Sequence, residues 1–303
     1  AYEIPKRDWS SDVCSSDLHK WRAYPIYPYG SYVKIATWNI LHGMALPEGL
    51  VHNDRLSERA KQLDVDVLAL QEVDFFQARS QGVDQCELIG KALGAKYSSR
   101  GITLQGTPGE KWRAFDPTKN VETHTPLNSL HALYGNGIVS RIPIIKEFRL
   151  NLGRSKLGAP LAIPQAPTNG GRPKMRLIYI HDEPRVAHAV YLENGYTIIN
   201  THLSFVPGMN VYQLRKIRSW ARTLPGMKIL LGDFNLPGKL PEKIIKWQGA
   251  VKAFTYPSWG ANLQFDHILI EQSHLTKYRA LAFATPKQMV SDHLPIGIEL
   301  LDL

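Results

Sequence analysis

The stretch KILLGDFN at residues 228–235 decides the fold assignment, because it places polar side chains directly after a short apolar run. The run lies between Gly226 and Gly232 and predicts a buried strand. Side chains alternate between the faces of an extended segment, so Asp233 and Asn235 are expected to point to the same side. A carboxylate beside an amide can activate a water molecule and bind an anionic oxygen. Because strand-to-turn junctions also favour Gly, Asp and Asn for backbone reasons, this tetrapeptide alone is weak evidence of catalysis.

Length and composition indicate a globular enzyme with a sizeable core. The chain has 303 residues, of which 44% are hydrophobic and 21% charged, as is ordinary for soluble domains. Its net charge of +9 suits a partner that carries phosphates. No apolar run approaches the roughly 18 to 20 residues that span a bilayer, and the compartment stays open between cytoplasmic and secreted. Cys14 and Cys86 are too few for a disulfide framework or a cysteine-based metal site.

The first twenty residues differ in character from the rest. Residues 7–18 (RDWSSDVCSSDL) are rich in Ser and Asp, lack periodicity and resemble translated sequencing-adaptor sequence. We therefore expect residues 1–20 to be a non-native or disordered leader. Residues 21–303 contain no internal repeat, low-complexity tract or interdomain linker, so we expect them to form a single domain, and we expect a monomer.

Apolar runs along the chain predict more strands than helices. Strands are expected at residues 32–38, 65–70, 185–192, 196–202, 228–231, 265–270, 280–284 and 296–301. Helices are expected at residues 55–63 with Asp54 as the cap, between Asp84 and Gly94, and at residues 212–222. Because the order is not a regular βαβ alternation, it indicates an α+β (layered α/β) fold with stacked sheets and outer helices.

Two polar stretches are expected to be long connections. The first, residues 101–130, contains Trp112 and Phe115. After it, residues 132–140 are expected to include a kink at YGNG. Residues 153–176 are rich in Gly, Pro and basic residues, and form either a solvated loop or a flap that faces phosphate. The expected helix at 212–222 also carries a basic stripe, which is more often a solvated face than a binding site. The stripe consists of Arg215, Arg218 and Arg222.

Short polar side chains occur at six ends of the predicted strands. They are Asn39, Glu72, His202, Asp233 with Asn235, Asp266, and Asp292 with His293. Each has an ordinary structural explanation as a turn former, a solvated strand end or a satisfied histidine. Because they recur where different strands can converge, we interpret them jointly as one site.

Carboxylates in this set favour metal-assisted phosphoester hydrolysis. A hard cation such as Mg²⁺ takes oxygen ligands and retains several waters, so one or two carboxylates suffice. Glu72 is the best candidate ligand, supported by Asn39 and Asp292. Zinc is less expected, because the histidines lack HExxH spacing and cysteine pairs are absent.

Histidines in the set are candidates for proton transfer and charge stabilisation. A hydrogen bond from His293 to Asp266 would fix the imidazole tautomer and stabilise its cation, so His293 could accept a proton from water or stabilise phosphate charge. His202 would be a second donor to charge that develops on the phosphorus oxygens.

Seven motifs occur in a fixed order between about residues 32 and 301. They are TWNI (37–40), LQEV (70–73), YGNG (134–137) with SRIP (140–143), NTHL (200–203), GDFN (232–235), FDHIL (265–269) and SDHLP (291–295). This ordered set resembles the endonuclease/exonuclease/phosphatase family, whose fold is that of pancreatic deoxyribonuclease, and suggests a bacterial member of unassigned substrate. The resemblance implies a four-layer sandwich of two packed, mostly antiparallel β-sheets flanked by helices. It also implies a phosphoesterase that depends on Mg²⁺ or Mn²⁺.

Matching the motifs implies a role for each residue on the metal side. Glu72 matches the metal-binding glutamate of the family, with Asn39 beside it. Asp292 and His293 match the terminal Asp-His pair, and Asp266 matches the carboxylate that orients the histidine.

The resemblance also implies residues on the water and phosphate side. Asp233 and Asn235 match the residues that orient the attacking water and bind phosphate. His202 matches a phosphate-contacting position that is tyrosine in some members, and Asn136 is a weaker phosphate-side candidate. All matched positions are intact, which argues against an inactive member.

The substrate stays open at this stage. The family cleaves DNA, RNA tails, sphingomyelin, inositol polyphosphates and protein–nucleic acid linkages, so the core motifs do not name one. Basic charge favours a nucleic-acid phosphodiester. Trp112 and Phe115 could stack on bases, seat at a lipid headgroup surface or simply cover the core. The alternatives are therefore a nuclease-type phosphodiesterase, a lipid (sphingomyelinase-like) or small-molecule phosphoesterase, and a non-catalytic binding module.

Overall fold

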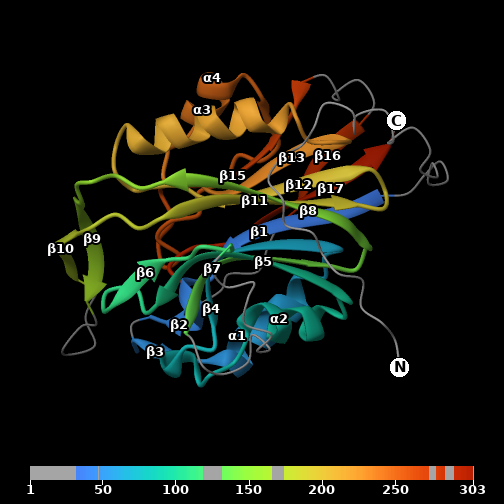
Figure 1. Ribbon diagram of the computed structural model, residues 1–303. Helices are drawn as coiled ribbons and strands as arrows, with labels where there is room; N and C mark the ends of the chain where they lie inside the picture. The colour runs from blue at the N-terminus through green and yellow to red at the C-terminus, as the bar shows by residue number, and fades with distance from the viewer. Residues whose placement is uncertain are drawn as a thin grey trace.

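Two large β-sheets pack face to face, and helices cover the outer face of each sheet (Figure 1). The computed structural model describes residues 32–46, 48–118, 132–165, 174–272, 278–283 and 290–302. The layered α/β sandwich predicted from the motifs is confirmed. The leader expected at residues 1–20 lies outside the described residues. Within the described ranges, no helix is both long enough and apolar enough to cross a membrane.

The first sheet has seven strands and is antiparallel except for one central pair. In sheet order its strands are β16 (Tyr278–Phe283), β17 (Ile296–Asp302), β1 (Tyr32–Asn39), β4 (Val67–Phe75), β7 (Leu133–Ser140), β5 (Tyr97–Gly106) and β6 (Trp112–Ala114). The parallel pair is β1 with β4. As a result, the carboxyl end of β1 lies beside the Gln71–Glu72 segment of β4.

The second sheet has six strands and again one parallel pair, β12 with β13. In sheet order its strands are β14 (Gln248–Gly249), β15 (Asp266–Ile270), β13 (Met227–Asp233), β12 (Tyr196–His202), β11 (Arg185–Leu192) and β8 (Ile144–Gly153). Two small antiparallel pairs lie outside these sheets. They are β2 (Met44–Ala45) with β3 (Leu50–Val51), and β9 (Ala159–Gln165) with β10 (Lys174–Ile180).

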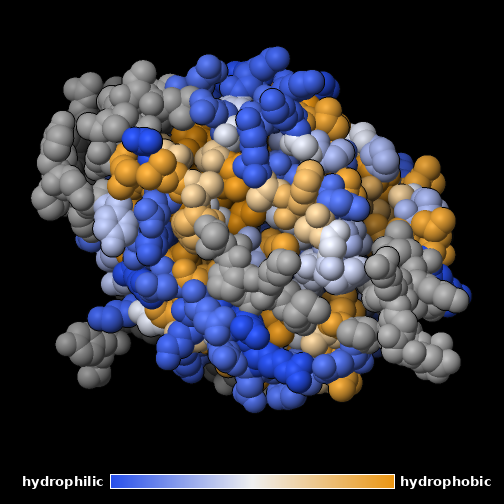
Figure 2. Space-filling model, turned by 180° about the vertical axis from the view of Figure 1, so that it is seen from behind, coloured by the Kyte–Doolittle hydropathy of each residue, from blue (hydrophilic) through white to orange (hydrophobic). Residues whose placement is uncertain are grey.

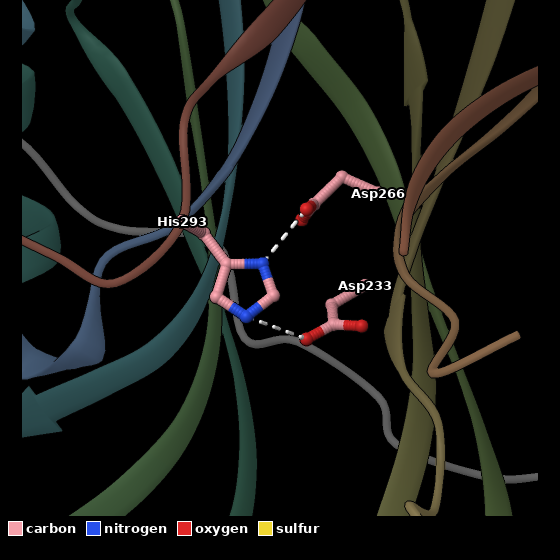
Figure 3. Close-up of side chains that lie close together, drawn as sticks. All are labelled: Asp233, Asp266 and His293. Carbon is pink, nitrogen blue, oxygen red and sulfur yellow. Dashed lines mark hydrogen bonds and ion pairs between the residues drawn. The ribbon is translucent and has the colours of Figure 1, made fainter. Parts of the chain in front are cut away.

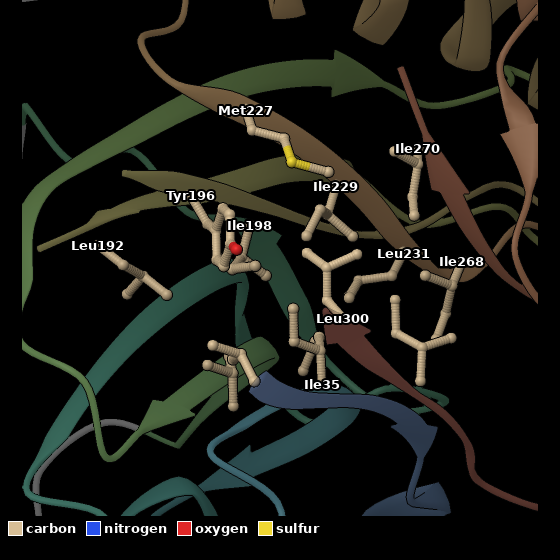
Figure 4. Packing of buried hydrophobic residues seen from close by; sticks show 14 of the residues in the cluster. Ile35, Leu192, Tyr196, Ile198, Met227, Ile229, Leu231, Ile268, Ile270 and Leu300 are labelled. Atoms are coloured by element: carbon tan, nitrogen blue, oxygen red, sulfur yellow. The ribbon is translucent and has the colours of Figure 1, made fainter. Parts of the chain in front are cut away.

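Alternating side chains along the strands build three apolar layers. Ile35 of β1 and Leu231 of β13 enter the core between the sheets, where Figure 4 shows them among the side chains of neighbouring strands. Ala36 faces the opposite way, toward α1 (Asn53–Leu63) and α2 (Gln85–Leu93). Leu230 likewise faces α3 (Met209–Ala221), which packs beside α4 (Leu240–Ile245). Hydrophilic residues cover the top and bottom of the molecule, where these helices lie (Figure 2).

Helix boundaries follow the predicted signals only in part. Asp84 accepts a hydrogen bond from the Glu87 amide at 3.0 Å, and Gly94 ends α2 at a φ of 69°, as predicted. The expected cap at Asp54 is wrong, because α1 already begins at Asn53 and Asp54 lies in its first turn. Helix α3 begins three residues before the predicted start, at Met209.

Both stretches predicted as long connections contain strands. Residues 101–130 include the end of β5 and all of β6, and residues 153–176 include β9 and the start of β10. The YGNG segment forms no kink but lies inside β7. Its glycines reflect close packing, since a Cβ at Gly135 would lie 2.3 Å from the Gly101 carbonyl oxygen. Residues 119–131 and 166–173 lie outside the described residues.

Candidate active site

Strand register brings most of the predicted site residues to one end of the sandwich. In the six-stranded sheet, His202 at the end of β12 is paired with Asp233 at the end of β13, and Asp233 is paired with Asp266 at the start of β15. In the seven-stranded sheet, Asn39 ends β1 beside Gln71 of β4. These strand ends of the two sheets face each other, so polar groups from both sheets meet there.

Glu72 reaches this site through a β-bulge and not through a strand end. Strand β4 continues to Phe75, so the prediction that the strand stops at Leu70 is wrong. Its register with β7 shifts between Leu70 and Val73, and Glu72 has a φ of 57°. A bulge of this kind redirects a side chain locally. Glu72 Oε1 therefore accepts a hydrogen bond from Asn39 Nδ2 at 3.0 Å.

Asn39 links carboxylates of the two sheets. The same Nδ2 atom that contacts Glu72 also donates to Asp233 Oδ2 at 3.0 Å. Its Oδ1 atom accepts from the Leu41 amide at 3.1 Å. Asn39 thus acts here as a donor between two acids, and its oxygen is directed at the backbone.

His293 lies between two buried carboxylates (Figure 3). Its Nδ1 is 2.7 Å from Asp266 Oδ2, and its Nε2 is 3.6 Å from Asp233 Oδ2. Burial by itself lowers the pKa of His293, but Asp266 and Asp233 outweigh it and hold that pKa well above 6.5. Burial also raises the pKa of Asp233, to about 7, although His293 opposes this shift. His293 is therefore an imidazolium at neutral pH, and Asp233 is poised to exchange a proton.

His202 has the opposite protonation preference. Its Nε2 lies 3.5 Å from Asp233 Oδ2, and its Nδ1 lies 4.0 Å from Glu72 Oε1. Burial, and then the positive charges of Arg185 and His293, lower the pKa of His202 well below 6.5. The site thus holds one cationic and one neutral histidine around a single carboxylate, an arrangement typical of divided acid–base roles.

Asn235 meets Asp233 by a route that strand alternation did not predict. Strand β13 ends at Asp233, and Asn235 has a φ of 49°, so the two residues do not share one extended segment. The Asn235 amide donates to Asp233 Oδ1 at 2.9 Å, and its side-chain Nδ2 donates to the Leu203 carbonyl at 3.0 Å. Asn136 lies inside β7, and its side-chain Nδ2 makes a weak contact of 3.5 Å with the Val186 carbonyl. The structure therefore does not join Asn136 to the other candidates by a hydrogen bond among the described residues.

An inter-sheet network beneath the site was missed by sequence reasoning. Gln71 Nε2 donates to Asn200 Oδ1 at 2.7 Å and to Thr37 Oγ1 at 3.0 Å. Asn200 Nδ2 donates in turn to the carbonyls of Leu70 and Gly137, at 2.9 and 2.8 Å. These side chains belong to the TWN, LQE and NTH motifs. Their position next to candidate residues in the sequence is the signal that could have revealed the network. The network ties β12 to β4 directly below Glu72 and His202.

One cluster among the described residues has the spacing of a cation site, and Asp292 is a further candidate ligand. Ligand atoms of Asp233, Asp266 and His293 lie within 4.8 Å of one another. Both nitrogens of His293 face carboxylates, however, and a protonated imidazole has no lone pair to offer a metal. Asp292 Oδ1 is buried without a hydrogen-bond partner among the described residues, and burial, opposed by His293 and assisted by the Glu72 charge, raises the pKa of Asp292 to about 6. An unpartnered carboxylate oxygen beside a second acid fits a hard cation better.

Known proteins share this architecture. A model of the Endonuclease/Exonuclease/phosphatase family matches residues 36–293, whereas no curated protein matches the chain. An endonuclease/exonuclease/phosphatase from Beutenbergia cavernae DSM 12333 is 17% identical with a TM-score of 0.59, over 89% of this chain and 72% of that one. The human Nocturnin catalytic domain with bound sulfate anion is 18% identical with a TM-score of 0.53, over 90% and 97%. Truncated Caenorhabditis elegans TDP2 is 16% identical with a TM-score of 0.52, over 89% and 97%. At these identities the likeness concerns the fold alone.

Proposed function

The chain belongs to the endonuclease/exonuclease/phosphatase family, and we propose that it is a Mg²⁺- or Mn²⁺-dependent phosphodiesterase that cleaves nucleic acid. Family membership supports phosphoester hydrolysis in general. The single observation that carries the finer proposal is the buried His293 imidazole between Asp266 and Asp233, next to the acids Glu72 and Asp292.

Glu72 and Asp292 are the proposed cation ligands, with Asn39 orienting the Glu72 carboxylate. The unpartnered Asp292 Oδ1 and the hydrogen bond that holds Glu72 Oε1 support this assignment. When bound there, the cation supplies Lewis-acid stabilisation of charge on a phosphoryl oxygen.

Asp233 is the proposed base for the attacking water. Its pKa of about 7 matches the working pH of a general base. Both carboxylate oxygens are held in position, Oδ1 by the Asn235 amide and Oδ2 by Asn39 Nδ2. Fixed in this way, Asp233 can take a proton from water without reorienting during the reaction.

The two histidines are proposed to face the phosphoryl group. His293, kept cationic by Asp266, can donate a hydrogen bond to a non-bridging oxygen as negative charge develops there. Neutral His202 offers a second N–H, and Asn235 and Asn136 are proposed phosphate contacts of the same kind. Each of these groups is buried or half-buried, so its interaction with phosphate is weakly screened by water.

Positive charge supports nucleic acid as the substrate class. The chain carries a net charge of +9, and cationic side chains supply most of the non-specific affinity for a phosphate backbone. Base stacking by the two aromatic candidates has less support. Arg154 lies over the Trp112 ring at 5.2 Å and Arg149 over the Phe115 ring at 5.7 Å, and Phe115 packs against the core under the helices.

A lipid phosphoesterase is the second candidate, supported by exposed apolar side chains on the β9–β10 arm. Leu157, Leu177 and Tyr179 are 70%, 73% and 56% exposed. The arm follows β8, whose last residue Gly153 pairs with Arg185 close to His202, and it projects from the sandwich in Figure 1. Apolar side chains in such a position suit a lipid surface.

The test compares the wild-type chain with the His293→Ala variant on supercoiled plasmid, single-stranded RNA, sphingomyelin vesicles and a chromogenic phosphodiester. His52→Ala, which removes an exposed histidine on the surface, is the matched control. We expect plasmid or RNA cleavage with Mg²⁺ or Mn²⁺ that is abolished by chelator and by His293→Ala. Turnover of lipid alone would favour the second candidate. Wild-type protein without metal-dependent turnover of any of the four substrates would overturn both.

A further inference from the structure

Arg185 is a buried cation that has an unused hydrogen-bond donor among the described residues. The residue is 6% exposed, and its Nε has no hydrogen-bond partner among the described residues. The nearest carboxylate oxygens belong to Asp182 at 3.9 Å and Glu183 at 4.0 Å. Both distances exceed hydrogen-bond reach, although a guanidinium has five N–H donors to satisfy.

A backbone irregularity lies at Arg185, at the end of β11 that is next to the candidate active site. The register of β11 with β8 shifts between Arg185 and Val186, so a bulge lies at the start of β11. Bulges re-aim side chains next to functional sites. The Arg185 charge lowers the pKa of His202 and counteracts the rise in the pKa of Tyr134, whose main cause is burial. Because β11 pairs with β12, with Ala187 opposite Thr201, Arg185 at the start of β11 lies near His202 at the end of β12.

Asp182 forms no hydrogen bond with Arg185, and its Oδ1, 3.9 Å from Arg185 Nε, is also buried without a hydrogen-bond partner among the described residues. Asp182 Oδ2 already accepts hydrogen bonds from the Ser155 amide at 2.6 Å and from Ser204 Oγ at 2.8 Å. Arg79 shows what a completed pair looks like in this protein, with two hydrogen bonds of 2.9 and 2.7 Å to Asp74. A buried charge without such partners is costly to retain. A guanidinium whose N–H donor lacks an acceptor therefore points to an external anion.

The two acids near Arg185 leave its guanidinium without a direct hydrogen bond to either of them. Asp182 is engaged by Ser155 and Ser204, as described. Burial raises the pKa of Glu183, with Arg185 opposing the shift, so the negative charge on this carboxyl group is disfavoured. In a site shielded from water, the attraction of an incoming anion to the guanidinium is strong.

We propose that Arg185 binds a non-bridging oxygen of the phosphoryl group of the substrate, next to His202. The inference rests on the proposed phosphoesterase function for the identity of the anion. A planar guanidinium can grip two oxygens of one phosphate at once, which a lysine at the same position cannot do. Arg185 thereby holds the phosphoryl group against the base Asp233 and is a binding residue that no motif of the sequence contains.

The experiment measures binding of inorganic phosphate directly, by calorimetry in the presence of chelator, for the full chain and three variants. Arg185→Gln removes the cation, and Arg185→Lys keeps the charge but loses the planar fork. Arg141→Gln is the matched control, because Arg141 pairs with Asp64 at 2.8 Å and bonds the Leu93 carbonyl. We expect Arg185→Gln to raise the phosphate Kd by about 10- to 100-fold, Arg185→Lys by less, and Arg141→Gln to leave it unchanged.

Two further readouts separate this inference from the proposed function. Thermal unfolding reports whether Arg185→Gln has only weakened the fold; a lower Tm with an unchanged phosphate Kd would overturn the inference. In assays with metal, Arg185→Gln should raise KM for a phosphodiester more than it lowers kcat. If the wild type binds phosphate through Arg185 but cleaves no phosphodiester, the binding site stands and the proposed function falls. If the wild type cleaves phosphodiesters and Arg185→Gln has the same KM and phosphate Kd, the proposed function stands and the inference about Arg185 falls.

Discussion

The two ends of the six-stranded sheet carry charge in opposite ways. At one end, Asp233, Asp266 and His293 are buried and contact one another. At the other end, a pocket of about 200 Å³ is lined by three cations of the helix layer, one of them half-buried and two exposed, together with the acid Glu271 and with apolar and polar neighbours. These cations are Arg218, Arg222 and Lys246. Hydrophilic residues also gather there on the surface, over α3 and α4 (Figure 2).

The difference has a physical cause at each end. Arg222 and Lys246 follow directly after α3 and α4, and Arg218 lies in the last turn of α3. Cations at helix carboxyl ends are stabilised by the helix dipole and by water, so they need no ligand. Buried acids and histidines lack that option and must share protons or bind ions. Burial of opposed charges therefore distinguishes the candidate site, whereas positive charge alone does not.

The largest effect is expected at the buried end, from His293→Ala. Loss of the imidazole removes a cation positioned for the phosphoryl group and leaves Asp233 and Asp266 without their shared partner. We expect kcat/KM to fall by about 10²- to 10⁴-fold. Steady-state kinetics on the substrate found in the screen measures the change, with His52→Ala as control. A variant that retains more than a tenth of wild-type activity would contradict the assignment.

A smaller effect, on stability, is expected from Asn200→Ala beneath the site. The substitution leaves the carbonyls of Leu70 and Gly137 and the amide of Gln71 without their buried partner. We expect the free energy of unfolding to fall by about 2 to 4 kcal/mol, as for other broken buried networks. Urea denaturation measures it. Substitution of the exposed Asn151 by Ala is the matched control. An equal loss in both variants would show that the buried network contributes no extra stability.

Sequence patterns predicted the parts of the molecule that depend on local chemistry. The helix between Asp84 and Gly94 was found because its cap and its left-handed terminator are coded within a few residues. The convergence of Asp233, Asp266 and His202 followed from polar residues at the ends of apolar runs, and strand register brings them together.

What the patterns missed depends on contacts between distant segments. The bulge at Glu72 has no local signature, because a left-handed glutamate is set by pairing with β7 and not by its neighbours in the chain. Gln71 and Asn200 are 129 residues apart, so their hydrogen bond exists only after the sheets have packed. Arg185 lies in an apolar strand, and nothing in its local sequence indicates that its Nε has no hydrogen-bond partner among the described residues.

Acid should destabilise the buried end through its neutral histidines. Burial, assisted by the charge of Arg149, lowers the pKa of His188 to about 3, and its Nε2 lies 2.6 Å from Ser99 Oγ. In the unfolded chain this histidine takes up a proton below about pH 6.5, so stability is lost as pH falls from 6.5 toward 3. At pH 5 the cost is about 2 kcal/mol.

His188→Gln tests this share of the acid sensitivity. The variant removes the titrating group, so its free energy of unfolding should fall less between pH 7.5 and pH 5 than that of the wild type, by about 2 kcal/mol. Denaturant titrations at the two pH values provide the comparison. The surface substitution His52→Gln is the control. Identical pH dependence in wild type and His188→Gln would mean that His188 is not held neutral by the fold.

The smallest effect is expected at the exposed end, from the double variant Arg218→Gln/Arg222→Gln. The two cations are stabilised by water and a helix end, so their loss should change the free energy of unfolding by no more than about 0.5 kcal/mol. For the same reason, kcat/KM and its salt dependence on nucleic acid should match those of the wild type. Each cation that contacts a backbone phosphate contributes about one unit to the slope of log K against log salt. A slope reduced by about two units would assign nucleic-acid contacts to this end as well, and positive charge would then be as informative as burial.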